Sequence, residues 1–241
     1  MSRLRDGELA AAFDAAAAAY DPLVAANPGY HRQLLRAAGA LALPHGGAGL
    51  RVLDLGCGTG ASTAALLRAA PRARITAVDA SAGMLDRAAA KRWPPRVTFV
   101  HATAEALAAA GVHGPFDAVF AAYLVRNLTD PLPVLSAVRE LLAPGGLLAV
   151  QDYTLSGARR HRLVWHAVCR GLIVPAGALS PGGAALYRHL WRSVLDFDTA
   201  PAFARRLRVA GFTGVRVSPA GGWQHGVLHT FLARTPPPGP Q

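Results

Sequence analysis

Several residue types are scarce in this chain of 241 residues, and each scarcity excludes a class of protein. There are only two cysteines, Cys57 and Cys169, which is too few for a disulfide framework and gives no spacing typical of metal ligands. Hydrophobic residues make up 52% of the chain, yet no stretch approaches the roughly 18 to 20 uninterrupted apolar residues that a membrane-spanning helix needs. The sequence therefore predicts a soluble protein without disulfides or a bound metal.

The N-terminus lacks the composition of a secretory signal peptide. Asp6, Glu8 and Asp14 lie where such a peptide has its positively charged and apolar regions. We therefore expect a cytoplasmic protein. The length suits one α/β domain, because domains commonly hold roughly 100 to 200 residues.

Acidic residues are scarce in the last third of the chain. Residues 1–155 hold 14 Lys and Arg against 12 Asp and Glu, whereas residues 156–241 hold 11 against 2, so most of the formal net charge of +11 lies there. Net charge bears on partners rather than on the fold. An anionic membrane surface, an acidic substrate and nucleic acid are the candidates, and a compositional drift toward arginine is the plain alternative.

What the chain does have, from residue 51 onward, is a regular alternation of apolar runs and amphipathic segments. We expect strands at 51–55, 74–78, 97–101, 118–122, 146–152, 213–218 and 227–234. We expect helices at 13–20, 31–41, 61–69, 82–91, 105–110, 131–142 and 199–210. Strands separated by helices of about ten residues form βαβ units. The predicted fold class is α/β, with a mostly parallel seven-stranded sheet and helices on both faces.

Breaks in this alternation divide the chain into five parts. Residues 1–45 are expected to form an N-terminal helical cap, and 46–155 the core of the sheet. Residues 156–200 are mostly helical and are expected to form a lid over the carboxyl ends of the strands, where ligands bind in such sheets and where the substrate is selected. Residues 201–234 are expected to add a helix and two closing strands to the core. Residues 235–241, rich in proline and glycine, are expected to be a disordered tail.

The strongest local signal follows the first expected strand. The run Val52-Leu53-Asp54-Leu55-Gly56-Cys57-Gly58-Thr59-Gly60 passes from an apolar strand through a glycine-rich turn into a helix. Glycines let the backbone approach a ligand at the N-terminus of that helix. Asp79 ends the next strand, 19 residues after Gly60, where a carboxylate can accept hydrogen bonds from both hydroxyls of a ribose. These residues predict a nucleoside-binding crevice.

The spacing of the glycines fits two kinds of nucleoside ligand. Gly56, Gly58 and Ala61 also match the G-x-G-x-x-G/A fingerprint of nicotinamide enzymes. Asp54 distinguishes between the two kinds of ligand, because a carboxylate beside the turn is electrostatically unfavourable for the pyrophosphate of a dinucleotide. The same carboxylate suits S-adenosylmethionine, which carries an ammonium and a sulfonium group. We therefore expect that cofactor and assign Asp54 to its site.

Four segments of the sequence carry a more specific resemblance. V-L-D-L-G-C-G-T-G is similar to the first motif of class I S-adenosylmethionine-dependent methyltransferases, which implies a Rossmann-like fold. The segments 13–32, 126–130 and 186–193, the last one ahead of Ala210-Gly211-Phe212, resemble those of the ubiquinone/menaquinone biosynthesis C-methyltransferase family. The resemblance spans residues from about 13 to 216. The R-N-L-T-D segment at 126–130 is much more specific than the glycine turn.

The resemblance implies which residues contact the cofactor. They are Gly56, Cys57, Gly58, Thr59 and Gly60 in the turn, Asp79, Ala80 and Met84 after the second strand, Thr103 and Ala104, Ala122 after the fourth strand, and Tyr20, which closes over the ligand. Thr103 departs from the family, which often has Asp or Asn there. Its hydroxyl is a weaker and shorter partner for the adenine amino group. Ala122 can offer only backbone groups.

The reaction that the resemblance implies is methyl transfer to a ring carbon of a lipophilic quinol. Arg126 would stabilise the adjacent phenolate, directly or through a water, and Asn127 would orient the loop or the substrate oxygen. Arginine does not readily lose a proton, which favours electrostatic stabilisation over general-base action. His225 and His229 have the separation of a helical metal pair, but they fall in an expected strand and the loop before it, so no zinc site is predicted.

The acceptor stays open at this point. Residues 221–227 depart from the more apolar closing strand of the family, so a polyketide or another aromatic secondary metabolite is an alternative acceptor. A protein that binds the cofactor without transferring a methyl group would have the same binding residues. No nucleic-acid partner is expected, because the sequence has no recognition module or interleaving of basic and aromatic residues.

The basic last third suggests a membrane partner. Arg159, Arg160 and Arg162 precede the apolar stretch 163–174. This pattern is typical of a helix that lies on an anionic membrane, here at its inner face, and also of an ordinary lid helix with a solvated basic start. The sequence leaves both open, and it leaves open whether the protein forms a homodimer.

Overall fold

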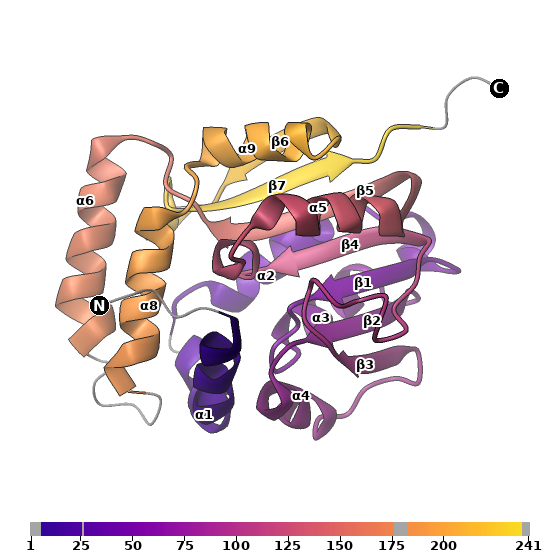
Figure 1. Ribbon diagram of the computed structural model, residues 1–241, viewed down its shortest axis with the longest axis horizontal. Helices are drawn as coiled ribbons and strands as arrows, with labels where there is room; N and C mark the ends of the chain where they lie inside the picture. The colour runs from indigo at the N-terminus through magenta and orange to yellow at the C-terminus, as the bar shows by residue number, and fades with distance from the viewer. Residues whose placement is uncertain (1–5, 26, 176–182, 238–241) are drawn as a thin grey trace.

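A computed structural model of the chain describes residues 6–25, 27–175 and 183–237 (Figure 1). The strands of the sheet are β1 (Arg51–Leu55), β2 (Arg74–Asp79), β3 (Val97–His101), β4 (Phe116–Ala122), β5 (Leu142–Tyr153), β6 (Thr213–Pro219) and β7 (Leu228–Arg234). Their order is β3-β2-β1-β4-β5-β7-β6. β7 runs antiparallel to both neighbours, and the other described pairings are parallel. The predicted α/β class with a mostly parallel seven-stranded sheet is confirmed.

The described helices include all but one of those expected. They are α1 (Asp6–Ala25), α2 (Tyr30–Gly39), α3 (Ala61–Ala69), α4 (Ala82–Ala89), α5 (Pro131–Leu141), α6 (Arg159–Val168), α8 (Gly183–Asp196) and α9 (Ala200–Val209). Shorter helical turns are η1 (Pro44–Gly47), η2 (Val125–Asn127), η3 (Cys169–Ile173) and η4 (Gly222–Gln224).

The helix expected at 105–110 is wrong. These residues form turns, with hydrogen bonds from the Ala106 N–H to the Thr103 carbonyl and from the Ala110 N–H to the Leu107 carbonyl. Six residues offer too few intrahelical hydrogen bonds to offset the cost of nucleating a helix. Gly111, with φ of 77°, then turns the chain toward β4.

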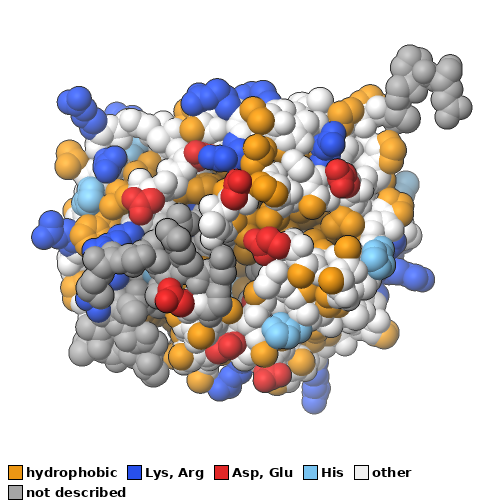
Figure 2. Space-filling model, in the orientation of Figure 1, with side chains coloured by type: hydrophobic (Ala, Val, Ile, Leu, Met, Phe, Trp, Pro, Cys, Tyr) orange, Lys and Arg blue, Asp and Glu red, His pale blue; other side chains and the backbone are white. Residues whose placement is uncertain are grey.

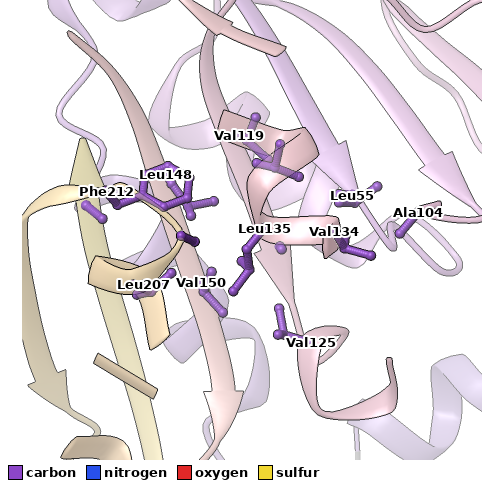
Figure 3. Close-up of a cluster of buried hydrophobic side chains, with 14 of the residues drawn as sticks. Leu55, Ala104, Val119, Val125, Val134, Leu135, Leu148, Val150, Leu207 and Phe212 are labelled. Carbon is purple, nitrogen blue, oxygen red and sulfur yellow. The ribbon is translucent and has the colours of Figure 1, made fainter. Parts of the chain in front are cut away.

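Helices cover both faces of the sheet because successive side chains of a strand point to opposite sides. Ala118 and Phe120 of β4 pack in a cluster with α2 and α3, whereas Val119 and Ala121 pack with α5 and α9. Figure 3 shows the second cluster, in which Leu135 of α5 and Leu207 of α9 lie close to strand residues. Each fully buried leucine contributes about 1.5 to 3 kcal/mol to the stability of this core.

Three helices gather where the parallel strands end. α1, α6 and α8 lie at that end of the molecule, beyond the tips of β4 and β5 (Figure 1). Residues 156–200 are mostly helical as expected, and the part at 176–182 lies outside the described residues. Trp165 of α6 is fully buried, and its indole N–H donates to the Trp191 carbonyl of α8 at 3.2 Å. The two helices therefore pack against each other as one unit.

The C-terminal segment corrects the expected start of the tail. Thr235 is 5% exposed, and its N–H donates to the Gly146 carbonyl at 3.0 Å while its hydroxyl donates to the Ala143 carbonyl at 2.7 Å. The irregular start of β5 leaves these carbonyls available, so the chain stays paired after β7 ends. Residues 238–241 lie outside the described residues.

No described helix is by itself both long enough and apolar enough to cross a membrane. α1 and α2 would pass such a test of length and composition only as a pair bent by 88°.

Candidate functional site

A cavity lies at the carboxyl ends of β1, β2, β3 and β4, the edge at which the sequence predicted a nucleoside site. Its walls come from the loops after these strands, from the starts of α3 and α4, and from α1 and α2. Eleven of the predicted cofactor residues line it: Tyr20, Gly56, Cys57, Gly58, Thr59, Asp79, Ala80, Met84, Thr103, Ala104 and Ala122. Asp54 and Gly60 are not among its lining residues.

The glycine turn wraps around the end of β2. The N–H groups of Gly56 and Cys57 both donate to the Val78 carbonyl, at 2.8 and 2.9 Å. Gly58, with φ of 55°, donates its N–H to Asp79 Oδ2 at 2.7 Å, and the Ser81 N–H donates to Oδ1 at 2.9 Å. Burial raises the pKa of Asp79, and these backbone hydrogen bonds oppose the rise. The Asp79 carboxylate is thus held at the cavity wall.

Asp54 lies behind the turn. Its side chain is fully buried, and Oδ2 accepts hydrogen bonds from the hydroxyls of Ser62 at 2.8 Å and Thr63 at 2.6 Å. Burial raises the pKa of Asp54 to about 7, although these hydrogen bonds favour the charged form. Asp54 therefore fixes the first turn of α3, and the structure does not bring it into contact with the cavity. A direct contact with the cofactor stays a prediction.

Gly60 makes room for a protein side chain. Its φ of 92° begins α3, and a Cβ at this position would lie 2.7 Å from the Trp93 ring. The Trp93 indole donates to the Ala88 carbonyl at 2.7 Å, which holds the ring in place. The need for glycine here arises from packing against Trp93 rather than from approach to a ligand.

The charge of the cavity wall suits a cation. Among the described residues, two acids, Asp79 and Glu105, line the cavity, and no lysine, arginine or histidine does. A pyrophosphate group would find no positive side chain there, whereas a sulfonium or an ammonium group would be attracted. The acidic character predicted from Asp54 is therefore supplied at the wall by two other carboxylates.

Helix α1 closes the cavity through Asp14. The Asp14 carboxylate accepts hydrogen bonds from the Ser81 hydroxyl at 2.5 Å and the Gly83 N–H at 2.9 Å, at the start of α4. The hydrogen bond from Ser81 lowers the pKa of Asp14. α1 also places Phe13 and Tyr20 in the cavity wall.

A second anchor joins the end of α1 to the glycine turn. Asp21 accepts from the Thr59 hydroxyl at 2.5 Å and forms an ion pair with Lys91 at 2.6 Å. Lys91 also donates to the Thr59 carbonyl at 2.7 Å. The sequence did not identify Asp14, Asp21 and Lys91 as site residues. The two acids lie within 13–32, one of the segments that carry the family resemblance.

The two predicted catalytic residues occupy different places. Asn127 lines the cavity, but Arg126 does not. Arg126 is 6% exposed, and its Nη1 lies 2.6 Å from Asp152 Oδ1 in a buried ion pair. Asp152 was missed by sequence reasoning. It lies one residue before the end of β5, the strand that pairs with β4, so the adjacency of two strand ends could have identified it.

The remaining wall is aromatic. Tyr20, Tyr30 and Tyr123 line the cavity with Phe13, and the Tyr30 and Tyr123 rings stack with centroids 5.1 Å apart. No described residue of 156–200 lines it, and residues of α1 and α2 form part of its wall, so the lid at 156–200 stays a prediction. α8 reaches the site through His189, whose Nε2 lies 3.2 Å from Asn127 Oδ1.

The strand order with an antiparallel β7, the glycine turn and the carboxylate at the end of β2 define a class I methyltransferase. A family model described as a methyltransferase domain matches residues 52–146. The chain is 32% identical over 216 residues to a demethylmenaquinone methyltransferase from Clavibacter sepedonicus, covering 88% of this chain and 84% of that protein. It therefore belongs to the ubiquinone/menaquinone biosynthesis family of S-adenosylmethionine-dependent methyltransferases, and S-adenosylmethionine is its cofactor.

Other relatives differ in the names of their substrates. A trans-aconitate 2-methyltransferase from Azoarcus sp. (strain BH72) is 37% identical over 179 residues, covering 66% of this chain and 67% of that protein. The solved structure of the plantazolicin methyltransferase BamL with S-adenosylhomocysteine superposes with a TM-score of 0.65 at 14% identity, covering 94% of this chain and 97% of that one. The latter likeness concerns the fold alone.

Proposed function

We propose that the enzyme transfers a methyl group to a ring carbon of a lipophilic quinol of the demethylmenaquinol type. The observation that carries this proposal is the composition of the cavity, which joins an acidic nucleoside end to an aromatic end. Asp79 and the glycine turn form the first, and Phe13, Tyr30 and Tyr123 form the second, with Tyr20, which is assigned to the cofactor, also in the wall. Such a cavity can hold a cationic adenosyl cofactor beside a planar apolar ring.

The nucleoside end offers partners for the ribose and the adenine of the cofactor. Asp79 is placed to accept from the ribose hydroxyls, and Ala80 and Met84 offer apolar contacts beside it. Thr103 and Ala104 also line the cavity, which supports their assignment to the adenine, with the Thr103 hydroxyl as a short polar partner. When bound, S-adenosylmethionine supplies an electrophilic methyl group on its sulfonium.

The aromatic end favours an uncharged ring over an acidic acceptor. A tricarboxylate such as trans-aconitate would need positive partners, and the described lining residues include none. Asn127 lines the cavity as well, with its amide nitrogen bonded to the Tyr123 carbonyl at 3.1 Å and its amide oxygen 3.2 Å from His189 Nε2. Positioning the two reactants can supply up to about 7 to 11 kcal/mol of the barrier reduction, without a metal or a covalent intermediate.

Transfer from methyl-labelled S-adenosylmethionine tests the proposal. Purified enzyme is incubated with demethylmenaquinol, with trans-aconitate or with a simple phenolic polyketide, and the labelled products are separated. We expect label in the quinol alone. Label in the polyketide but not the quinol would support the alternative aromatic acceptor, and tight cofactor binding without labelled product would support a binding protein.

A peripheral membrane contact through α6 would bring the enzyme to a lipophilic acceptor. Arg159, Arg160 and Arg162 are exposed, and Leu163 and Leu172 are 67% and 66% exposed. Figure 2 shows basic side chains along the edge of the molecule where α6 lies. We propose that this surface rests on an anionic membrane, because each basic residue near such a surface contributes about 1 kcal/mol.

Sedimentation with liposomes tests the membrane contact. Wild type should bind vesicles that contain anionic lipid more strongly than zwitterionic ones, and replacing Arg159, Arg160 and Arg162 by Gln should remove the difference. The matched control replaces three other exposed arginines by Gln, Arg205 and Arg208 of α9 and Arg216 of β6, and should keep the difference. Equal partitioning of wild type between the two lipid compositions would remove this proposal.

A further inference from the structure

Tyr123 has a rare backbone conformation at the edge of the cavity. It follows directly after β4, and its φ is 59°. Residues with a Cβ seldom adopt this left-handed conformation, and they persist in it only where the surrounding structure holds them there. Such residues cluster in binding and active sites. No motif in the sequence marks Tyr123.

Hydrogen bonds hold the main chain of Tyr123 on both sides. Its N–H donates to the Gln151 carbonyl at 2.7 Å. Its carbonyl oxygen accepts from Arg126 Nη1 at 2.7 Å and from Asn127 Nδ2 at 3.1 Å. The two residues that the sequence singles out for the reaction therefore converge on one carbonyl. Asp152 binds the same Arg126 nitrogen, which fixes the guanidinium.

The Tyr123 ring forms a braced part of the cavity wall. It stacks on Tyr30 at 5.1 Å with an angle of 13° between the planes, and it leans on Tyr153 at 5.3 Å and 39°. Gln151 Nε2 donates to its hydroxyl at 2.8 Å. Its backbone is clamped, its ring is supported by two rings and an amide, and Tyr123 is therefore a fixed residue of the cavity wall.

We propose that Tyr123 determines which acceptor binds, with its ring as the wall against which the acceptor ring lies, and that Arg126 and Asn127 are positioning residues that act through its carbonyl. The inference rests on the proposed function, because it needs a planar acceptor ring at the aromatic end. His189 extends the arrangement, since its contact with Asn127 ties α8 to the same carbonyl.

Substitution of the ring tests the contact with the acceptor. Tyr123→Leu should raise the acceptor KM about tenfold, the order expected for the loss of one aromatic contact, while the Kd for S-adenosylmethionine changes less than about twofold. Tyr123→Phe keeps the ring and should stay within about threefold of wild type. The matched control is Tyr153→Leu, in a ring that packs on Tyr123 but does not line the cavity. An unchanged KM in Tyr123→Leu, or an equal rise in the control, overturns the inference.

A double-mutant cycle tests whether Arg126 acts through Tyr123. Arg126→Lys should lower kcat/KM in wild type but should cause little further loss in Tyr123→Leu, because the positioned ring is already gone. Losses that multiply in the double variant would mean that Arg126 contacts the acceptor itself. If Arg126→Lys no longer binds S-adenosylmethionine, the combined variant Arg126→Met with Asp152→Asn, which removes both charges of the buried pair, takes its place in the cycle.

A binding measurement separates this inference from the proposed function. Menadione, which has the naphthoquinone ring, is titrated calorimetrically into protein saturated with S-adenosylhomocysteine. Wild-type binding that Tyr123→Leu weakens about tenfold supports the inference even if demethylmenaquinol is not methylated. Turnover and menadione binding that are both insensitive to Tyr123→Leu overturn the inference alone. A wild type that neither methylates demethylmenaquinol nor binds menadione overturns the proposed function and the inference together.

Discussion

Arg126 and Asp152 form a buried ion pair that joins the ends of two neighbouring strands, with 2.6 Å between Arg126 Nη1 and Asp152 Oδ1. The side chains are 7% and 0% exposed. Asp152 Oδ2 also accepts from the Arg126 N–H at 3.1 Å, so one carboxylate holds both the side chain and the main chain of the arginine. The loop that carries Tyr123 and Asn127 depends on this pair.

Removal of one partner of this pair should be costly. Asp152→Ala leaves a buried guanidinium without its carboxylate, and we expect the free energy of unfolding to fall by about 3 to 5 kcal/mol. The control is Asp198→Ala, which breaks the more exposed pair with Arg206 and should cost about 1 kcal/mol or less. Urea denaturation measures both. Equal losses in the two variants would show that burial does not determine how much the Arg126–Asp152 pair contributes to the free energy of unfolding.

The two glycines at the start of α3 should respond differently to alanine. Gly60→Ala should lose about 2 to 4 kcal/mol of stability, because a Cβ with φ of 92° is strained and would overlap Trp93. Gly58→Ala meets no atom within 4 Å and should lose less stability, but its Cβ would enter the cavity that Gly58 lines. Thermal unfolding and calorimetric titration with S-adenosylmethionine check both. A loss of cofactor affinity in folded Gly60→Ala that exceeds the loss in Gly58→Ala would contradict the assignment.

Asp54 should make stability depend on pH near neutrality. Burial raises its pKa to about 7 from an ordinary value of 3.8. The folded protein therefore holds this proton more tightly than the unfolded chain does, so the stabilisation is complete at low pH and is lost as the pH rises through about 7. Asp54→Asn has no charge to bury. The melting temperature of the variant relative to wild type should rise from pH 5 to pH 8, and a constant difference would refute the assignment.

The same titration should couple to the cofactor. A bound cation favours the charged carboxylate, so S-adenosylmethionine should draw the proton from Asp54 and bind more tightly as the pH rises from 6 to 8. The change is at most about tenfold per pH unit for one proton. Calorimetry at several pH values should show a weaker dependence for Asp54→Asn. A wild-type Kd that does not vary with pH would exclude this coupling.

The Asp21–Lys91 ion pair should limit how fast α1 moves away from the cavity. Lys91→Gln removes the ion pair that holds the end of α1 to the glycine turn. Because exposed pairs contribute about 0.2 to 1 kcal/mol, we expect S-adenosylmethionine to associate and dissociate about two to five times faster. Loss of positive charge alone would speed association but slow dissociation of a cationic ligand. Stopped-flow measurements distinguish the two. Arg92→Gln makes the same charge change at a neighbouring exposed position without breaking the ion pair, so it should slow dissociation rather than speed it.

The fold was largely predictable because hydrophobic periodicity determines the elements of a parallel sheet. The runs at 51–55 and 97–101 and the helix at 61–69 were predicted with the observed bounds. The helix expected at 105–110 was wrong because its apolar spacing was taken as sufficient. A segment of six residues is too short to offset the cost of nucleating a helix. The predicted start of the disordered tail was wrong at Thr235. The hydrogen bonds of this residue depend on an irregularity of β5 that no local pattern reveals.

The site was predictable where it consists of consecutive residues and not where it depends on distant contacts. The turn at 56–60 and Asp79 are local signals. Asp152 lies 26 residues from Arg126, and their pairing depends on the register of β4 against β5. Tyr123 was missed because its φ and the two hydrogen bonds to its carbonyl are properties of the folded loop.

Methyl transfer to carbon is the central claim, and nuclear magnetic resonance tests it most directly. The enzyme is given S-adenosylmethionine with a ¹³C-labelled methyl group together with demethylmenaquinol, and the isolated product is examined. We predict a labelled methyl group bonded to a carbon of the quinone ring. A label on oxygen, or unlabelled quinol recovered from enzyme that binds S-adenosylmethionine, would contradict it.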